Sequence, residues 1–265
     1  MIAIRDIDFS KAVSNPSSAI VLKSSDFGLP DSLSSVIPVS VAVLDTGCPA
    51  HSGLRLNENH FQNNHVDMTG HESIPWDMNG HATAIAGAIA GKTAKFSGIC
   101  SSALMYYAKC IDSDGKTSIK KIASGLLWSA AKEVDIAVVA AGSVERDRYL
   151  EEVVAKCLQR GIIIVAAGKS NSQKNSKHMY PGNCAGVISC YFGEKTCVNA
   201  RPEGGIDVQI GHRSSWTLAP DERYIKLGGS SMASAIVAGF MASHIASGMM
   251  KERLFEKMKE ISPCQ

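Results

Sequence analysis

The sequence predicts an α/β fold with a mostly parallel central sheet and helices on both faces. Short runs of apolar and β-branched residues, typical of buried strands, alternate along the chain with segments whose apolar residues recur at helical spacing. Strands separated by helices pair in parallel, because each helix carries the chain back to the start of the next strand. At 265 residues the chain is long enough to form one large core.

The first elements precede residue 92. Ser10 to Pro38 is rich in Ser and Pro, so we expect an irregular N-terminal arm over residues 1–38 that packs on the body or covers a cleft. Val39 to Leu44 is the first buried strand. His81 then opens a helix of small residues, which must pack very closely against a neighbouring element, and Gly91 follows that helix.

Four further helices and two strands are predicted by the same criteria. The helices are Thr117–Glu133 (capped by Thr117 or Ser118), Asp147–Arg160 (ended by Gly161), Met232–Ser247 and Lys251–Ile261, and the strands are Val134–Ala140 and Ile162–Ala166. The last helix, in the C-terminal segment 250–265, is expected to dock through Leu254, Phe255 and Met258. We predict one domain spanning residues 1–265.

Composition bears on the expected partners and cellular location of the protein. Lys and Arg total 27 against 25 Asp and Glu, a net charge of +2, so no charge argument favours nucleic acid or a membrane as a partner. The start, Met1 to Asp6, has neither the apolar core nor the cleavage pattern of a signal peptide. The eight cysteines include no C-x-x-C pair. We therefore expect free thiols in a reducing cytoplasm rather than four disulfides.

A serine flanked by glycines opens the helix predicted at Met232. Gly228 and Gly229 can adopt backbone angles closed to other residues, so the chain can turn sharply and place Ser231 in the first helical turn. Unpaired backbone N–H groups and the positive end of the helix dipole favour negative charge there. The position suits a nucleophile for acyl transfer, although serine is also an ordinary helix cap.

A serine nucleophile needs a base to take its proton and a carboxylate to orient that base. Asp45 follows the first strand, at the end where open α/β sheets place their sites, and His81 begins a helix. Each has an ordinary alternative, the aspartate as a turn or helix cap and the histidine as a packed or capping residue. Together with Ser231 they form a candidate catalytic triad.

These segments resemble the signature blocks of the subtilisin-like serine proteases, or subtilases. The blocks are Asp45-Thr46-Gly47, His81-Ala82-Thr83-Ala84-Ile85-Ala86-Gly87 and Ser231-Met232-Ala233-Ser234, in the order that the family has. The resemblance extends through Gly98–Lys109 and Lys120–Asp135 and covers most of the chain from Val39 to Gly239. It implies a three-layer subtilisin-like fold and a serine endopeptidase with Asp45, His81 and Ser231 as catalytic residues.

The site that would bind the oxyanion departs from the family. There an asparagine after Ala-Ala-Gly donates a hydrogen bond to the oxyanion, whereas here Lys169 follows Ala166-Ala167-Gly168. Loss of that donor costs about 100-fold to 1000-fold in rate in this family, although an ammonium folded into the site can stabilise an oxyanion as well. The candidates for this role are Lys169, Asn171 and Ser230.

The resemblance also identifies a substrate cleft. The segment starting at Ala140 resembles one whose backbone pairs with substrate as an added strand. Met179 stands where the family has a glycine on the floor of the pocket for the residue before the cut, so we expect a shallow pocket that prefers Ala, Gly or Ser. The predicted substrate-binding residues are Ala140, Ala141, Gly142, Ser143, Ala167, Gly168 and Met179.

Neither a metal site nor a nucleotide site is predicted. The loop between Asp45 and His81 contains His51, His60, His65, Asp67, His71 and Glu72, but their spacing fits no zinc pattern, and a substrate-rim loop is the simpler interpretation. Lys92–Ser97 replaces the family's calcium loop without carboxylates, so we expect no calcium there. Gly168-Lys169-Ser170 resembles the tail of a phosphate-binding loop, but Ile163 stands where that motif needs glycine.

The preferred interpretation is a cytoplasmic serine endopeptidase without a cofactor that acts on peptide or protein substrates. Two alternatives remain open. Lys169 favours a catalytically impaired relative kept as a binding module. A peptide acyl-transferase or leader-processing enzyme differs only in whether an amine or water resolves the acyl-enzyme.

Overall fold

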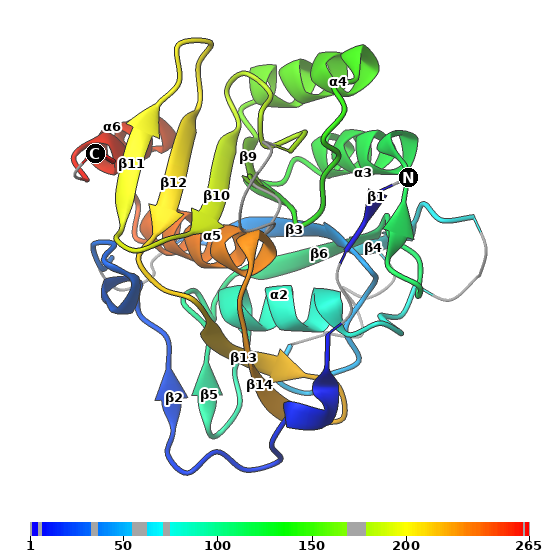
Figure 1. Ribbon diagram of the computed structural model, residues 1–265, viewed down its shortest axis with the longest axis vertical. Coiled ribbons are helices and arrows are strands. Elements are labelled where there is room, and N and C mark those ends of the chain that lie inside the picture. Colours follow the sequence, from blue (N-terminus) through cyan, green and yellow to red (C-terminus); the bar gives the residue numbers. More distant parts are fainter. Residues whose placement is uncertain are drawn as a thin grey trace.

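The predicted sheet is present. The structure, a computed structural model, describes residues 2–4, 7–32, 37–54, 63–70, 75–168, 179–261 and 263–264. Its centre is an eight-stranded sheet (Figure 1). In spatial order the strands are β11 (Cys197–Ala200), β12 (Ile206–Ile210), β10 (Ile188–Phe192), β9 (Ile163–Ala167), β8 (Ile136–Val139), β3 (Ser40–Asp45), β6 (Leu104–Lys109) and β4 (His65–Asp67). Neighbours are parallel except β11 and β12.

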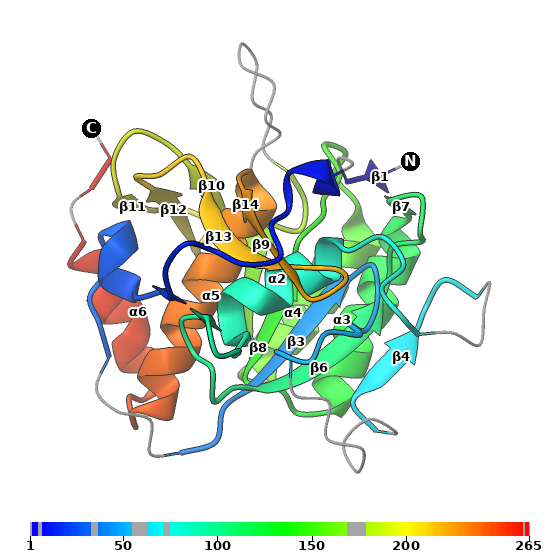
Figure 2. The ribbon, with the colours of Figure 1, turned by 90° about the horizontal axis from the view of Figure 1, so that it is seen from below.

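Different helices cover the two faces of the sheet (Figure 2). One face carries α2 (His81–Ala90), α5 (Ser230–Ala246) and α6 (Lys251–Lys259), and the other carries α3 (Ile119–Ala131) and α4 (Arg148–Gln159). Side chains of β3 alternate between them: Val41 and Val43 join the core with α2 and α5, while Ala42 and Leu44 join the core with α3 and α4. The strand is buried on both faces, which explains its unbroken apolar run. The three-layer α/β prediction is confirmed.

The N-terminal arm packs on the body through short strands and bridges. The pairs are β1 (Ile2–Ala3) with β7 (Lys116–Thr117), β2 (Ile20–Val21) with β5 (Phe96–Ser97), and Val13 with Tyr224 of the antiparallel hairpin β13 (Ser215–Ala219) and β14 (Arg223–Leu227). The arm also contains the 3-10 helices η1 (Phe9–Lys11) and η2 (Ser24–Phe27). The arm thus contains more regular structure than its Ser and Pro content indicated.

The helix ends follow the predicted chemistry. The Ser118 hydroxyl accepts a hydrogen bond from Lys121 N–H at 3.4 Å and caps α3, and the Asp147 carboxylate accepts one from Leu150 N–H at 2.9 Å and caps α4. In α6, Leu254 and Met258 are fully buried, so the docking face of this helix is confirmed. Within the described residues, no helix has both the length and the apolar character needed to cross a bilayer.

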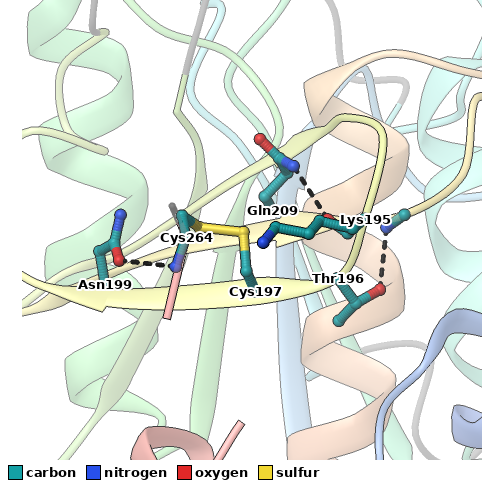
Figure 3. The surroundings of a disulfide bond; sticks show 7 residues. Lys195, Thr196, Cys197, Asn199, Gln209 and Cys264 are labelled. Carbon is teal, nitrogen blue, oxygen red and sulfur yellow. Dashed lines mark hydrogen bonds between the residues drawn. A yellow bond between two sulfur atoms is a disulfide. The ribbon is translucent and has the colours of Figure 1, made fainter. Parts of the chain in front are cut away.

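A disulfide joins the C-terminal segment to the edge of the sheet (Figure 3). Cys197 on β11 is bonded to Cys264, 67 positions later, with their Cα atoms 5.0 Å apart. Cys264 N–H also donates a hydrogen bond to the Asn199 side chain at 3.0 Å. The expectation of free thiols is wrong for this pair, because the chain beyond α6 returns to β11, and no sequence spacing shows that return. The remaining six cysteines are free and buried.

Candidate active site

The candidate site lies where β3 and β8 end. After β3 the chain forms β4 and β6, which lie on one side of β3 in the sheet. It forms β8, on the other side of β3, only later. Ligands of open α/β sheets bind at such a change of direction, beyond the carboxyl ends of the strands. Asp45 ends β3 and Ala140 follows β8, each one step beyond the paired residues Leu44 and Val139. Asp45 and Ala140 are therefore neighbours at this edge.

Asp45 and His81 are in direct contact. Both oxygens of the Asp45 carboxylate lie 2.8 Å from His81 Nδ1, and Asp45 is fully buried. Thr46 N–H donates a further hydrogen bond to Asp45 Oδ1 at 2.7 Å, which fixes the carboxylate. A carboxylate only accepts, so Nδ1 carries the hydrogen and the lone pair is on Nε2. This is the tautomer that a general base needs.

The environment of His81 favours its protonated form. Burial favours the neutral ring, but the charges of Asp45 and Asp77, together with the Asp45 hydrogen bond, outweigh burial and raise the His81 pKa above its ordinary value. An imidazolium that forms when His81 takes a proton is therefore stabilised where it forms.

Asp77 organises the first turn of α2, although sequence analysis did not select it. Its Oδ1 accepts a hydrogen bond from Gly80 N–H at 2.7 Å, and its Oδ2 accepts two from Thr83. The Thr46 hydroxyl donates to Asp77 Oδ1 at 2.7 Å and accepts from Ala82 N–H at 3.0 Å. The helix that carries His81 is thereby tied to the loop that follows Asp45. An acidic residue four positions before a helix start was the available signal.

Gly47 lets that loop approach. Its φ is +141°, and a Cβ there would lie 2.6 Å from Trp76 O and 2.7 Å from Pro75 O. The segment leading to Asp77 runs alongside, with Cys48 N–H donating to Pro75 O at 2.7 Å. Only glycine allows this approach, which explains the residue at the end of the Asp-Thr-Gly block.

Ser231 lies in the first turn of α5, as predicted. Gly229 precedes the helix with φ +95°, and a Cβ on Gly228 would lie 2.3 Å from Arg213 O. Both glycines are thus required for the sharp entry. The Ser231 hydroxyl donates a hydrogen bond to Ala140 O at 2.8 Å. Ser231 therefore lies at the same edge of the sheet as Asp45 and His81. Among the described side chains, no hydrogen bond joins Ser231 to His81.

The oxyanion candidates are only partly placed. Lys169 and Asn171 lie outside the described residues. Ser230 is the buried first residue of α5, next to Ser231. Gly168 N–H donates to Cys190 O at 2.9 Å, so this amide serves the sheet.

The predicted cleft segments meet one another. Ser143 and Tyr180 exchange two backbone hydrogen bonds, Ser143 N–H to Tyr180 O at 2.9 Å and Tyr180 N–H to Ser143 O at 2.7 Å. Met179 N–H donates to Gly168 O at 3.0 Å. The Met179 side chain lies over Gly142, since a Cβ there would be 2.9 Å from both Cβ and Cε of Met179. Met179 therefore lies between the backbone segment that contains Gly142 and the one that contains Gly168. Ala140, Ala141 and Ala167 are buried at the ends of β8 and β9.

The described polar side chains of the loop before His81 lie in different parts of the fold. His51 is buried and its Nδ1 accepts a hydrogen bond from Gly53 N–H at 2.9 Å, whereas His65 and Asp67 lie on β4 at the far edge of the sheet. Among the residues that the structure describes, no three His, Cys, Asp or Glu side chains converge as metal ligands. His60, His71 and Glu72 lie outside the described residues, so the absence of a metal site stays a prediction.

Comparison with known proteins places the chain in a family. The Subtilase family profile matches residues 38–192. Among similar proteins, Subtilisin BL of Lederbergia lenta is 31% identical over 211 residues, covering 77% of this chain and 75% of the relative. Subtilisin Savinase of the same organism is 30% identical, with the same two coverages. M-protease of Shouchella clausii is 30% identical over 77% of this chain and 53% of its own length. The chain therefore belongs to the subtilase family of serine endopeptidases.

Proposed function

We propose that this endopeptidase cleaves peptide bonds with Ser231 as nucleophile, His81 as general base and Asp45 as the group that orients the base. The observation that supports this most strongly is the contact of the buried Asp45 carboxylate with His81 Nδ1, which leaves Nε2 free to accept a proton. Ser231 lies in the first turn of α5, at the same edge of the sheet.

The chemistry then follows in two halves. The Ser231 hydroxyl turns from Ala140 O to His81 Nε2, which takes its proton as Oγ attacks the substrate carbonyl. The negative charge on the carbonyl oxygen develops near the amino end of α5. When the peptide C–N bond breaks, the leaving amine takes the proton from His81, and water repeats the sequence on the acyl-enzyme to release the acid.

The proposal includes a preference for Ala, Gly or Ser before the cut. It is supported by Met179, whose side chain packs on Gly142 while its backbone N–H is bonded to Gly168 O. A thioether side chain in that position takes the volume that a large substrate side chain would need.

Three further parts of the proposal concern the whole chain. Residues 1–265 form one peptidase domain, supported by the strand pairs of the arm and by the packing of α6 on the core. No metal cofactor takes part, so EDTA should leave activity unchanged. A cytoplasmic location stays a prediction. The six free cysteines favour it, whereas the Cys197–Cys264 bond is typical of an oxidising compartment.

Labelling with a fluorophosphonate tests the proposal. The native chain should gain one adduct by intact mass, and Ser231→Ala should gain none while keeping the native circular dichroism spectrum. A native chain that hydrolyses a casein substrate and is not labelled would overturn the assignment of Ser231. Peptide mapping of the adduct on residues 229–239 identifies the labelled residue directly.

Two observations favour an impaired binding module as the second candidate. The Ser231 hydroxyl is bonded to Ala140 O rather than to the base, and Lys169 stands at the family's asparagine position. A folded native chain that is neither labelled nor active would support this candidate. Lys169→Asn then tests whether the missing oxyanion donor is the cause, since restoring it should restore labelling.

A further inference from the structure

Arg201 is a buried charged residue outside the catalytic segments. It directly follows β11 and is 9% exposed. Burying a guanidinium is costly unless its N–H groups are paired. Here the two terminal nitrogens donate to three backbone carbonyls: Nη1 to Gly182 O at 2.8 Å, and Nη2 to Cys184 O at 3.1 Å and to Val187 O at 2.5 Å, whereas Nε has no hydrogen-bond partner among the described residues. A single side chain thus holds a six-residue segment, 182–187.

The surroundings of Arg201 are built to admit it. A Cβ on Gly205, whose φ is +88°, would lie 2.6 Å from Arg201 Nη2 and 2.5 Å from Val187 O. Asp207 provides a carboxylate 3.8 Å from Arg201 Nε, and the side chain of Asp207 is 15% exposed. The guanidinium therefore has space and a balancing charge, and its two terminal nitrogens have acceptors.

The segment that Arg201 holds continues directly from the floor of the proposed pocket. Asn183 N–H donates to Met179 O at 2.8 Å, and Cys184 N–H donates to Pro181 O at 2.9 Å. Gly182 packs tightly on the end of β9, where a Cβ would lie 2.8 Å from Ala167 O. Displacement of this segment would consequently move Met179 and the backbone next to it.

We propose that Arg201 is a positioning residue for substrate binding. By holding the carbonyls of 182–187 it fixes Met179 against Gly168 and Tyr180 against Ser143, and so sets the shape of the pocket. The inference rests on the proposed function, because it concerns the same cleft. Arg201 contacts neither the triad nor the substrate and acts through Met179 and Tyr180.

Arginine is required rather than any cation. The three carbonyls accept from two different terminal nitrogens of one planar group. The ammonium of a lysine is a single point and cannot reproduce this fork. Arg201→Lys should thus behave like Arg201→Met, although it keeps the charge.

Kinetics separate positioning from general support of the fold. We compare Arg201→Lys and Arg201→Met with Arg148→Met, whose side chain is 91% exposed on α4. On peptide anilides that differ in the residue before the cut, both Arg201 variants should raise KM by about tenfold or more and flatten the preference between Ala and Phe. Labelling of Ser231 by a small fluorophosphonate, which leaves the pocket empty, should stay within about twofold of native. Arg148→Met should match the native enzyme in KM, in the preference between Ala and Phe, and in labelling.

Two outcomes would overturn the inference. One is native KM and preference in Arg201→Lys, since charge alone would then suffice. The other is a parallel loss of labelling and hydrolysis, since Arg201 would then support the triad as well. If Arg201→Met fails to fold, Arg201→Lys and Arg201→Gln carry the comparison.

Hydrogen exchange tests the same inference without activity. The amides of Ser143 and Tyr180 are protected by their mutual bonds, and in Arg201→Met they should exchange about tenfold faster or more while amides of α5 keep native rates. Unchanged protection at both amides would contradict the inference. A native chain that is neither labelled nor active would defeat the proposed function alone, and exchange would still decide whether Arg201 holds this segment.

Discussion

The Asp77 carboxylate accepts two hydrogen bonds from Thr83, one from its backbone N–H and one from its hydroxyl, each 2.7 Å long. Thr83 lies two residues after His81 in the first turn of α2. Asp77 therefore places a second carboxylate near the base without touching it, and its charge helps to raise the His81 pKa. A nearby charge that favours imidazolium also determines the pH at which the base becomes available.

Replacing this charge should move the pH profile. His81 must be neutral to accept a proton, so kcat/KM rises as pH increases through its pKa. Asp77→Asn removes one of the charges that raise this pKa, and the acid limb of the profile should move to lower pH. Asp114→Asn, a carboxylate whose side chain is 72% exposed, is the matched control and should leave the limb in place. An Asp77→Asn limb at the native position would show that this charge does not act on His81.

Enlarging the pocket should broaden specificity. Met179→Gly removes the side chain that packs on Gly142, so peptides with Phe before the cut should gain about tenfold or more in kcat/KM relative to those with Ala. Met250→Ala, at an exposed methionine remote from the cleft, provides the control. A native enzyme that already turns over Phe or Leu peptides faster than Ala peptides would refute the shallow pocket.

The three residues of the candidate triad could be selected from the sequence because each stands in a distinctive local setting. Asp45 follows an apolar strand, His81 starts a helix of small residues and Ser231 follows two glycines. The fold was predictable over β3, β8, β9 and the helices for a similar reason, since their apolar patterns are long or fully buried. In β12, Ile206, Val208 and Ile210 alternate with polar residues, which is a strand signal, but the pairing of β12 with β10 could not be read from it.

What the sequence could not provide depends on contacts between distant segments. Arg201 meets the carbonyls of 182–187 only because the turn between β11 and β12 lies next to them in the fold. The hydrogen bond from Ser231 to Ala140 O depends on a side-chain rotamer and joins residues 91 positions apart. Neither relation leaves a periodic or spaced pattern in the chain.

The disulfide should stabilise the fold without serving catalysis. Cys197 and Cys264 close a loop of 67 residues, for which loop-closure entropy predicts about 4 kcal/mol of stabilisation. In urea denaturation, the double variant Cys197→Ser/Cys264→Ser should lose about 4 kcal/mol of its free energy of unfolding. It should keep the native kcat/KM at about 298 K. Dithiothreitol should lower the stability of the native chain and leave the variant unchanged. Equal stability of the two proteins without reductant would exclude the effect.

The free thiols should be unreactive in the folded protein. Burial raises the pKa of Cys48 to about 12, with Asp77 adding to the effect, and burial together with Glu151 raises the pKa of Cys184 to about 12. Iodoacetamide at neutral pH should therefore leave activity intact, although Cys48 lies only three residues from Asp45. Ellman's reagent should detect the six free cysteines only after unfolding. Rapid inactivation by either reagent would show that one of these thiols is open to solvent.

A carboxylate at the opposite end of the sheet should give stability a specific pH dependence. Asp135 precedes β8, and its Oδ2 accepts hydrogen bonds from Ser40 N–H at 2.9 Å and from the Ser40 hydroxyl at 2.8 Å. Its Oδ1 lies 3.0 Å from Lys251 Nζ, at the start of α6. Burial alone would raise the pKa of Asp135, but the Ser40 bonds and Lys251 lower it below its ordinary value.

The sign of the effect follows from that direction. A folded-state pKa below the unfolded one, which is about 4, means that the stabilisation is fully present above pH 4 or so and is lost as pH falls through the folded-state pKa. Asp135→Asn should consequently lower the free energy of unfolding by roughly 2 kcal/mol at neutral pH, the value of hydrogen bonds to a charged group. The difference from native should shrink as the solution is acidified. Urea denaturation at a series of pH values measures this difference in free energy of unfolding, with the exposed Asp114→Asn as control. A difference that stayed constant down to acid pH would mean that the Asp135 charge contributes nothing to stability and that only the volume or polarity of the side chain matters.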